Sequence, residues 1–215
     1  MPELSFQIRG AEPVCAAAAP AIALYLEVSS NPVDQAVETV ILNCQIQIEA
    51  PRRTYDTAEQ ARLRDLFGEP ERWGQTLRPL HWTNLTTTVP AFTGSIGIKL
   101  AIPCTFDLEV TAAKYFHALE CGMAPLILLF SGTIFYRTGS NQLQAAPIPW
   151  NSEARYALPA GIWRECIDLH QPNTAWLPLR RDNFERLYDF KVRHGLATFD
   201  QAIERMLEIP MEADA

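Results

Sequence analysis

The eight residues 42–49, LNCQIQIE, alternate an apolar and a polar side chain at every step. Successive side chains of a β-strand point to opposite faces of its sheet, so this segment predicts a strand with one dry face and one wet face. Strands of a parallel sheet are buried on both faces and are apolar throughout. The alternation therefore indicates an antiparallel sheet.

Other segments alternate in the same way, and turn-forming residues separate them. The run 126–136 is apolar on both faces, which predicts a central strand, and Pro147 and Pro149 predict the end of the sheet region. Together these patterns predict a two-layer antiparallel β-sandwich. The further alternating segments are 4–9, 22–28, 96–102 and 106–110, with turns at 29–32 and 93–95.

Two regions change to helical spacing. Between residues 55 and 75, Thr57 and Gln60 form a capping-box pattern, and Gly68 marks the end of a helix. This region predicts a helical insertion that covers an edge or an open end of the sandwich. From residue 158 onward the pattern predicts helices that start near Pro159, Asp182 and Thr198.

The fold class predicted from these patterns is α+β, dominated by the antiparallel two-layer sandwich. Residues 1–150 are expected to form the sandwich with its helical insertion at about 55–75. Residues 151–215 are expected to form a C-terminal helical segment that packs on the sandwich.

Composition limits the classes of partner. The net charge of −7 argues against a nucleic-acid partner, because phosphate binding needs a basic surface. The longest apolar runs fall short of the ~20 residues that a membrane-spanning helix needs. The five cysteines are widely spaced and lack a metal-binding cadence, which is typical of a reducing cytoplasm. A cytoplasmic protein without a cofactor is expected.

The stretch AAKYFHALECGMAPLILLFSG, residues 112–132, has the densest candidate chemistry. His117 and Cys121 are four residues apart, so a helix would place both on one face, and Cys104 is the nearest further metal ligand in sequence. The alternative is packing: a histidine near the end of a helix complements the helix dipole, and a cysteine before Gly122 is a common half-buried residue. We favour packing.

The remaining signal lies in polar strand faces and nearby aromatic residues. These predict a recognition surface rather than an active site, because LFSG at 129–132 lacks the first glycine of a nucleophile elbow and no other catalytic motif is present. A non-enzymatic role is therefore favoured. The candidate binding residues are Trp73, His81, Trp82, Thr86 and Thr88.

Several longer phrases resemble an uncharacterised bacterial family whose genes neighbour those of actinobacterial-type NiFe-hydrogenases. The resemblance spans residues 4 to about 207 and implies a genomic setting; the family supplies no established catalytic residues. Its pattern does not call for a cysteine at position 121, which weighs further against a metal pair there. The phrases are QIEAPRRTY (47–55), LFGEPERWGQTLRPLHWT (66–83), VPAFTGS (89–95), AAKYFHAL (112–119) and PLILLFSGTIFY (125–136).

Our leading hypothesis is a non-enzymatic accessory protein that binds a hydrogenase subunit or maturation factor. Two alternatives remain open from the residues. One is a metal-binding or Cys-dependent enzyme centred on Cys104, His117 and Cys121. The other is a structural protein that associates with itself through exposed strand edges.

Overall fold

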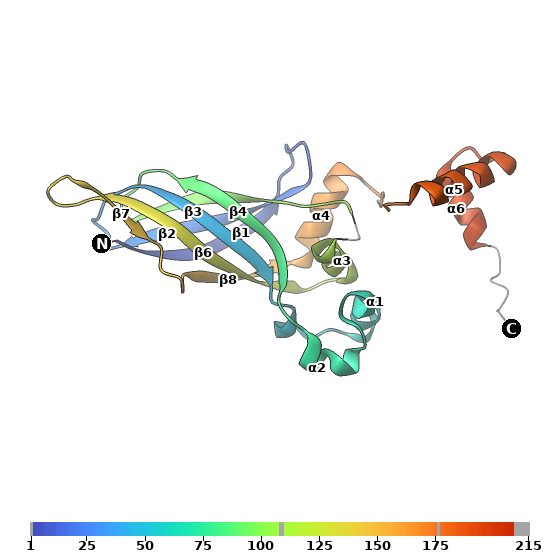
Figure 1. The fold of residues 1–215 in the computed structure, drawn as a ribbon, viewed down its shortest axis with the longest axis horizontal. Coiled ribbons are helices and arrows are strands. Elements are labelled where there is room, and N and C mark those ends of the chain that lie inside the picture. Colours follow the sequence, from blue (N-terminus) through green and yellow to red (C-terminus); the bar gives the residue numbers. More distant parts are fainter. Residues whose placement is uncertain (1, 108–109, 176, 209–215) are drawn as a thin grey trace. The chain divides into compact units, whose positions relative to one another are not determined.

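Strand β3 (Val37–Ile48), which contains all of the stretch LNCQIQIE except its last residue, lies inside a five-stranded antiparallel sheet (Figure 1). The computed structural model describes residues 2–107, 110–175 and 177–208. The chain divides into two units, Met1–Trp176 and Leu177–Ala215. All strands of the described ranges belong to the first unit.

Two antiparallel sheets form the sandwich. In the five-stranded sheet the order is β4-β3-β6-β7. Strand β8 also pairs with β6: β8 pairs with residues 123–129 of β6, and β7 pairs with residues 133–137. The three-stranded sheet has the order β1-β2-β5. The bounds are β1 (Glu3–Pro13), β2 (Ala21–Asn31), β4 (Leu80–Val89), β5 (Ser95–Pro103), β6 (Met123–Arg137), β7 (Leu143–Pro147) and β8 (Glu153–Pro159).

The apolar halves of the alternating strands face each other between the sheets. The Phe6 ring of β1 stacks on the Phe130 ring of β6, with centroids 4.1 Å apart, so the contact crosses from one sheet to the other. Burial of these side chains is the main stabilising contribution. The buried positions of the stretch in β3 are Leu42, Cys44, Ile46 and Ile48, and those of β2 include Ile22, Leu24, Leu26 and Val28.

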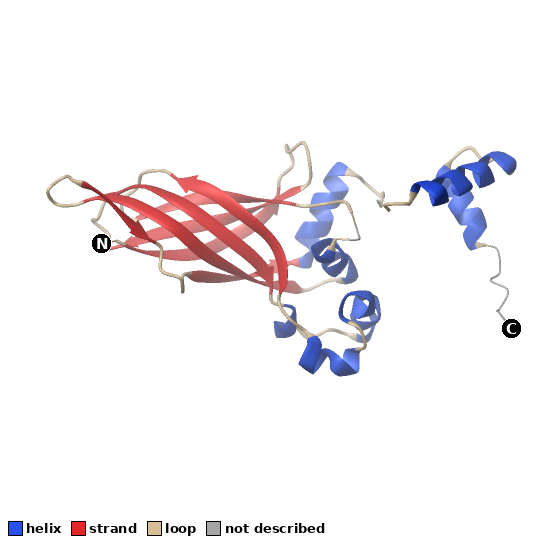
Figure 2. Cartoon of the chain, in the orientation of Figure 1, coloured by secondary structure: helices blue, strands red, loops and turns tan. Residues whose placement is uncertain are grey.

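The α-helices of the first unit gather at one end of the sandwich (Figure 2). Their aromatic side chains close this end of the core: Phe116 of α3 contacts Trp82 of β4 and Trp163 of α4, with centroids 4.9 and 5.9 Å apart. Helices α1 and α2 fall in the region 55–75 of the predicted insertion, whereas these contacts come from α3 and α4. The helices are α1 (Thr57–Phe67), α2 (Trp73–Thr76), α3 (Thr111–Ala118) and α4 (Ala160–His170), with 3₁₀ turns at Ala50–Arg52 and Pro70–Arg72.

The helix starts differ in detail from the predicted ones. The cap of α1 is Asp56, whose carboxylate accepts from the Glu59 N–H at 2.8 Å, so the prediction of a Thr57–Gln60 capping box was wrong by one residue. Asp is a stronger cap than Thr, and the pattern Asp-x-x-Glu competes with Thr-x-x-Gln at this point. The predicted helix end at Gly68 is confirmed by its φ of 74°.

Two strand predictions also need correction. The sheet does not end at Pro149, because β8 follows and pairs with β6 from Met123 to Leu129. Of the predicted strand 106–110, residues 108 and 109 lie outside the described residues, while Phe106 and Val110 are not in a strand. The central position of the run 126–136 is confirmed, since β6 pairs with β3 on one side and with β7 and β8 on the other.

The second unit contains two helices, α5 (Arg181–Arg193) and α6 (Phe199–Leu207). The predicted helix start at Thr198 is confirmed, since its hydroxyl accepts from the Gln201 N–H at 3.2 Å. Helix α5 ends two residues before Gly195, which has a φ of 62°, a conformation that commonly follows a helix end.

The fold class is therefore α+β with an antiparallel two-layer sandwich, as the sequence predicts. The domain boundary at residue 150, and the packing of the whole segment 151–215 on the sandwich, stay predictions. None of the helices in the described ranges is long and apolar enough to cross a membrane.

Candidate functional site

The five residues predicted to bind a partner lie in two different environments. His81, Thr86 and Thr88 are exposed on the outer face of the five-stranded sheet. Trp73 is buried among the helices, with 8% of its surface exposed, and Trp82 points inward onto Phe116. The structure thus places the three polar residues on one face of β4, and neither tryptophan shares that exposed face.

The outer face of the five-stranded sheet is polar across neighbouring strands. Asn43 of β3 lies opposite Thr86 of β4 and Ser131 of β6, and the Thr86 hydroxyl donates to the Asn43 side-chain oxygen at 2.9 Å. Trp150 lies beside this row with 94% of its surface exposed. Sequence reasoning missed Trp150 because it lies between two strands, in a segment without alternation.

The proposed metal ligands do not meet. Helix α3 ends at Ala118, so Cys121 lies in the following loop and the prediction that it shares a helix face with His117 was wrong. Leu119 is fully buried in an extended conformation, which stops the helix three residues before the predicted Gly122. His117 instead lines a hollow beside Trp163 and Asp168 of α4.

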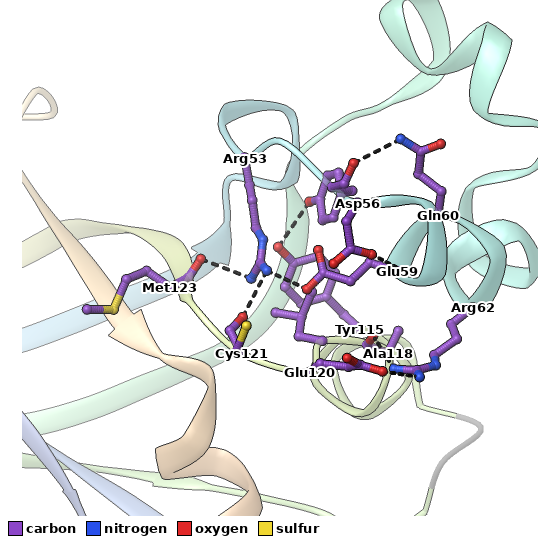
Figure 3. A network of polar contacts seen from close by, with 12 residues as sticks. Arg53, Asp56, Glu59, Gln60, Arg62, Tyr115, Ala118, Glu120, Cys121 and Met123 are labelled. Atoms are coloured by element: carbon purple, nitrogen blue, oxygen red, sulfur yellow. Dashed lines mark hydrogen bonds and ion pairs between the residues drawn. The ribbon is translucent and has the colours of Figure 1, made fainter.

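Arginine side chains donate to the carbonyl group of Ala118, the last residue of α3, and to those of residues that follow it (Figure 3). Arg62 of α1 donates to the Ala118 carbonyl, Arg164 of α4 donates to those of Leu119 and Glu120, and Arg53 donates to those of Cys121 and Met123. We call residues 118–123 the arginine-bound loop. Cys121 takes part through its backbone, and its thiol is exposed.

Arg53 also forms a buried ion pair. Its Nη2 atom lies 2.5 Å from Glu59 Oε1, and the two side chains are only 12% and 3% exposed. Beside this pair, the Tyr55 and Tyr115 hydroxyls are 3.0 Å apart. Burial raises the pKa of both hydroxyls, so both remain protonated near neutral pH and act as hydrogen-bonding groups of the core. The network holds the helices together.

We expect the purified protein to contain metal well below one equivalent. Among the described residues, no group of three or more His, Cys, Asp or Glu side chains could hold a metal ion. Elemental analysis of the wild type and of His117→Ala checks this, and both should give the same low value. One equivalent of metal in the wild type that His117→Ala loses would restore the metal hypothesis.

Exposed apolar side chains are numerous on helices α5 and α6. Phe184, Tyr188 and Val192 follow one stripe of α5 at four-residue spacing. The Phe199 ring joins the two helices, with its centroid 5.5 Å from Phe184 and 6.5 Å from Tyr188. We call this surface the hairpin face; its exposed members are Phe184, Tyr188, Val192, Ile203, Met206 and Leu207.

The hairpin face is exposed because two short helices cannot bury it against each other. Among the described residues of this unit, only Ala202 is buried. Leu207 is 80% exposed and Val192 58%. Acidic and basic residues are equally numerous in 177–208, although the whole chain has a net charge of −7. Recognition by this face would therefore depend on apolar contact.

The family described as "Family of unknown function (DUF6084)" matches residues 1–215. The chain belongs to this family. No curated protein matches the DUF6084 chain. A crystal structure titled as the putative ApaA protein from Bordetella pertussis is similar over 74% of this chain and 92% of its own, with 13% identity and a TM-score of 0.24.

Proposed function

We propose that this DUF6084 protein is a non-enzymatic accessory protein that binds a partner protein through the hairpin face. The partner in this proposal belongs to a NiFe-hydrogenase system, as a subunit or a maturation factor. The exposed apolar surface of α5 and α6 supports the binding role. The resemblance of the phrases at 47–55, 66–83 and 112–119 supports the choice of partner.

The physical argument for binding is the incomplete burial of the hairpin. Chains below ~40 residues rarely bury enough apolar surface to be stable without added cross-links, metals or partners. An amphipathic helix with an exposed apolar stripe commonly docks into an apolar groove of another protein. A partner that covers Phe184, Tyr188 and Ile203 would complete the core that these helices lack.

The proposal predicts that partner capture depends on the apolar stripe. Tagged full-length protein, recovered from a strain with its hydrogenase operon intact, should carry a hydrogenase subunit or maturation protein. The variant Phe184→Ser/Tyr188→Ser should recover at least tenfold less, because large buried aromatic residues dominate most interfaces. The matched control is Glu185→Ser/Asp189→Ser on α5, whose side chains are exposed and lie outside the hairpin face; it should recover the partner as the wild type does.

Three outcomes would contradict the proposal in different ways. Recovery of no hydrogenase protein would refute the choice of partner. Equal recovery by the wild type and the serine variant would refute the hairpin face as the binding surface. Light scattering that shows a dimer in the wild type and a monomer in the serine variant would assign the face to a second copy, in favour of self-association.

A further inference from the structure

Cys104 and Cys166 lie together although they are far apart in sequence. Cys104 follows the end of β5, and Cys166 is a buried residue of α4. The Cys104 N–H donates to the Pro20 carbonyl at 2.8 Å, and the Cys166 thiol lies 3.3 Å from the Ala21 carbonyl oxygen. Both residues thus contact consecutive residues, Pro20 and Ala21, where β2 begins, and the Cys104 thiol lies 3.7 Å from the Ile102 carbonyl oxygen. The two thiols are close enough that each shifts the pKa of the other.

A histidine reinforces this arrangement. His170 lies one helical turn after Cys166, with Nδ1 3.1 Å from the Cys166 carbonyl oxygen and Nε2 3.1 Å from the Ala17 carbonyl oxygen. A nitrogen that carries a proton donates to the carbonyl oxygen facing it, so these contacts hold the ring beside Cys166. The form of a thiol that reacts with oxidants is the thiolate.

The two thiols shift each other's pKa in opposite directions. The Cys104 thiol keeps its proton, because its interaction with Cys166 and burial both raise its pKa. The interaction with Cys104 lowers the pKa of Cys166 against the effect of burial, and His170 acts in the same direction as Cys104. This is the arrangement of a nucleophilic sulfur beside a protonated partner. By contrast, burial alone raises the pKa of Cys44 to about 12, as expected for an inert thiol of the core.

We propose that Cys104 and Cys166 are a redox-active pair that peroxide closes to an intramolecular disulfide, joining the end of β5 to α4. Hydrogen peroxide oxidises one thiol to a sulfenic acid and is itself reduced, with loss of one water. The second thiol then attacks the sulfenic sulfur, the S–S bond forms, and a second water leaves with the remaining proton. Two thiols thus lose two hydrogens, and one peroxide becomes two waters.

The closed pair should stabilise the first unit. A disulfide lowers the entropy of the unfolded chain, and the loop between residues 104 and 166 is long enough for a large effect. We expect oxidation to raise the midpoint of thermal unfolding by about 10 °C. The new bond fixes α4 to the strand end that it already contacts through its hydrogen bonds.

The test uses the full-length variant Cys15→Ser/Cys121→Ser, which removes the two exposed thiols and keeps the proposed pair. The protein is treated with hydrogen peroxide, unfolded in the presence of a thiol-alkylating reagent, and digested for mass spectrometry. The expected product is a peptide linked between Cys104 and Cys166, which dithiothreitol separates. The increase in the unfolding midpoint should disappear with the same reductant.

The matched control adds Cys166→Ala, which should abolish both the link and the increase in the unfolding midpoint. Should that variant fail to fold, Cys104→Ser serves the same purpose, because Cys104 is only half-buried. Full alkylation of both cysteines after peroxide treatment would overturn the proposal. So would oxidation of either sulfur to a sulfinic acid without a link, or a link to Cys44.

Discussion

Replacing Gly132 by alanine should cost about 4 kcal/mol of unfolding free energy, a large share of the ~5–15 kcal/mol that keeps most domains folded. Gly132 has a φ of 140°, and an added Cβ would lie 2.0 Å from the Ile41 carbonyl oxygen. The positive φ and the close carbonyl oxygen both belong to the backbone of the central strands, so no side-chain rotation can relieve the clash of an added Cβ. Urea unfolding followed by tryptophan fluorescence measures the loss.

The geometry of Gly132 follows from its place on β6. One edge of β6 pairs with β8 up to Leu129 and with β7 from Thr133 onward. Between these two segments the Gly132 carbonyl accepts a hydrogen bond, at 2.9 Å, from the N–H of Ile148, the residue just after β7. The strand changes its partner here, and only glycine adopts this backbone conformation readily.

Gly97→Ala is the matched control. Gly97 is also in a strand, but it lies in β5, and a Cβ added there would meet no atom within 4 Å. The change should alter the unfolding free energy by no more than about 0.5 kcal/mol. If Gly132→Ala and Gly97→Ala unfold at the same urea concentration, the prediction is wrong, because β6 and β3 can then move apart at Gly132 enough to accommodate the added Cβ.

Five strands of the sandwich, β1, β2, β3, β5 and β6, could be predicted from the sequence because alternation is a local signal. In LNCQIQIE the polarity of each residue indicates whether its side chain faces the core or the solvent, and no distant residue is needed for this inference. Strand β8 escaped prediction because its buried positions, Ala154 and Leu158, are few and prolines stand before it. Prolines 147 and 149 end β7 rather than the sheet.

The contacts that join distant segments could not be predicted in this way. Cys104, Cys121 and Cys166 are equally isolated in the sequence, yet only the fold brings two of them together. The expected partnership of His117 and Cys121 assumed a helix that continues to Gly122. The helix ends earlier because Leu119 enters the core and arginines from other segments satisfy the carbonyls that follow.

Arg53→Ala should destabilise the protein by about 3–5 kcal/mol, because it leaves the Glu59 carboxylate without its partner in a nearly water-free site. The same change removes the donors to the Cys121 and Met123 carbonyls, at 2.9 and 3.2 Å. Arg53→Lys should recover part of the loss, since an ammonium group keeps the charge but cannot reproduce the planar fork. Chemical unfolding of the wild type, Arg53→Ala and Arg53→Lys measures the order of their stabilities.

The control for this prediction lies on the next helix. Arg62 pairs with Glu120, and both side chains are about half exposed, at 45% and 54%. Water and salt screen such a pair, so Arg62→Ala should cost less than about 1 kcal/mol. The double change Arg53→Met/Glu59→Met removes both buried charges at once and should be less harmful than Arg53→Ala alone. If the double variant is instead the least stable, the Arg53 contacts to the arginine-bound loop, and not the ion pair, stabilise this end of the sandwich.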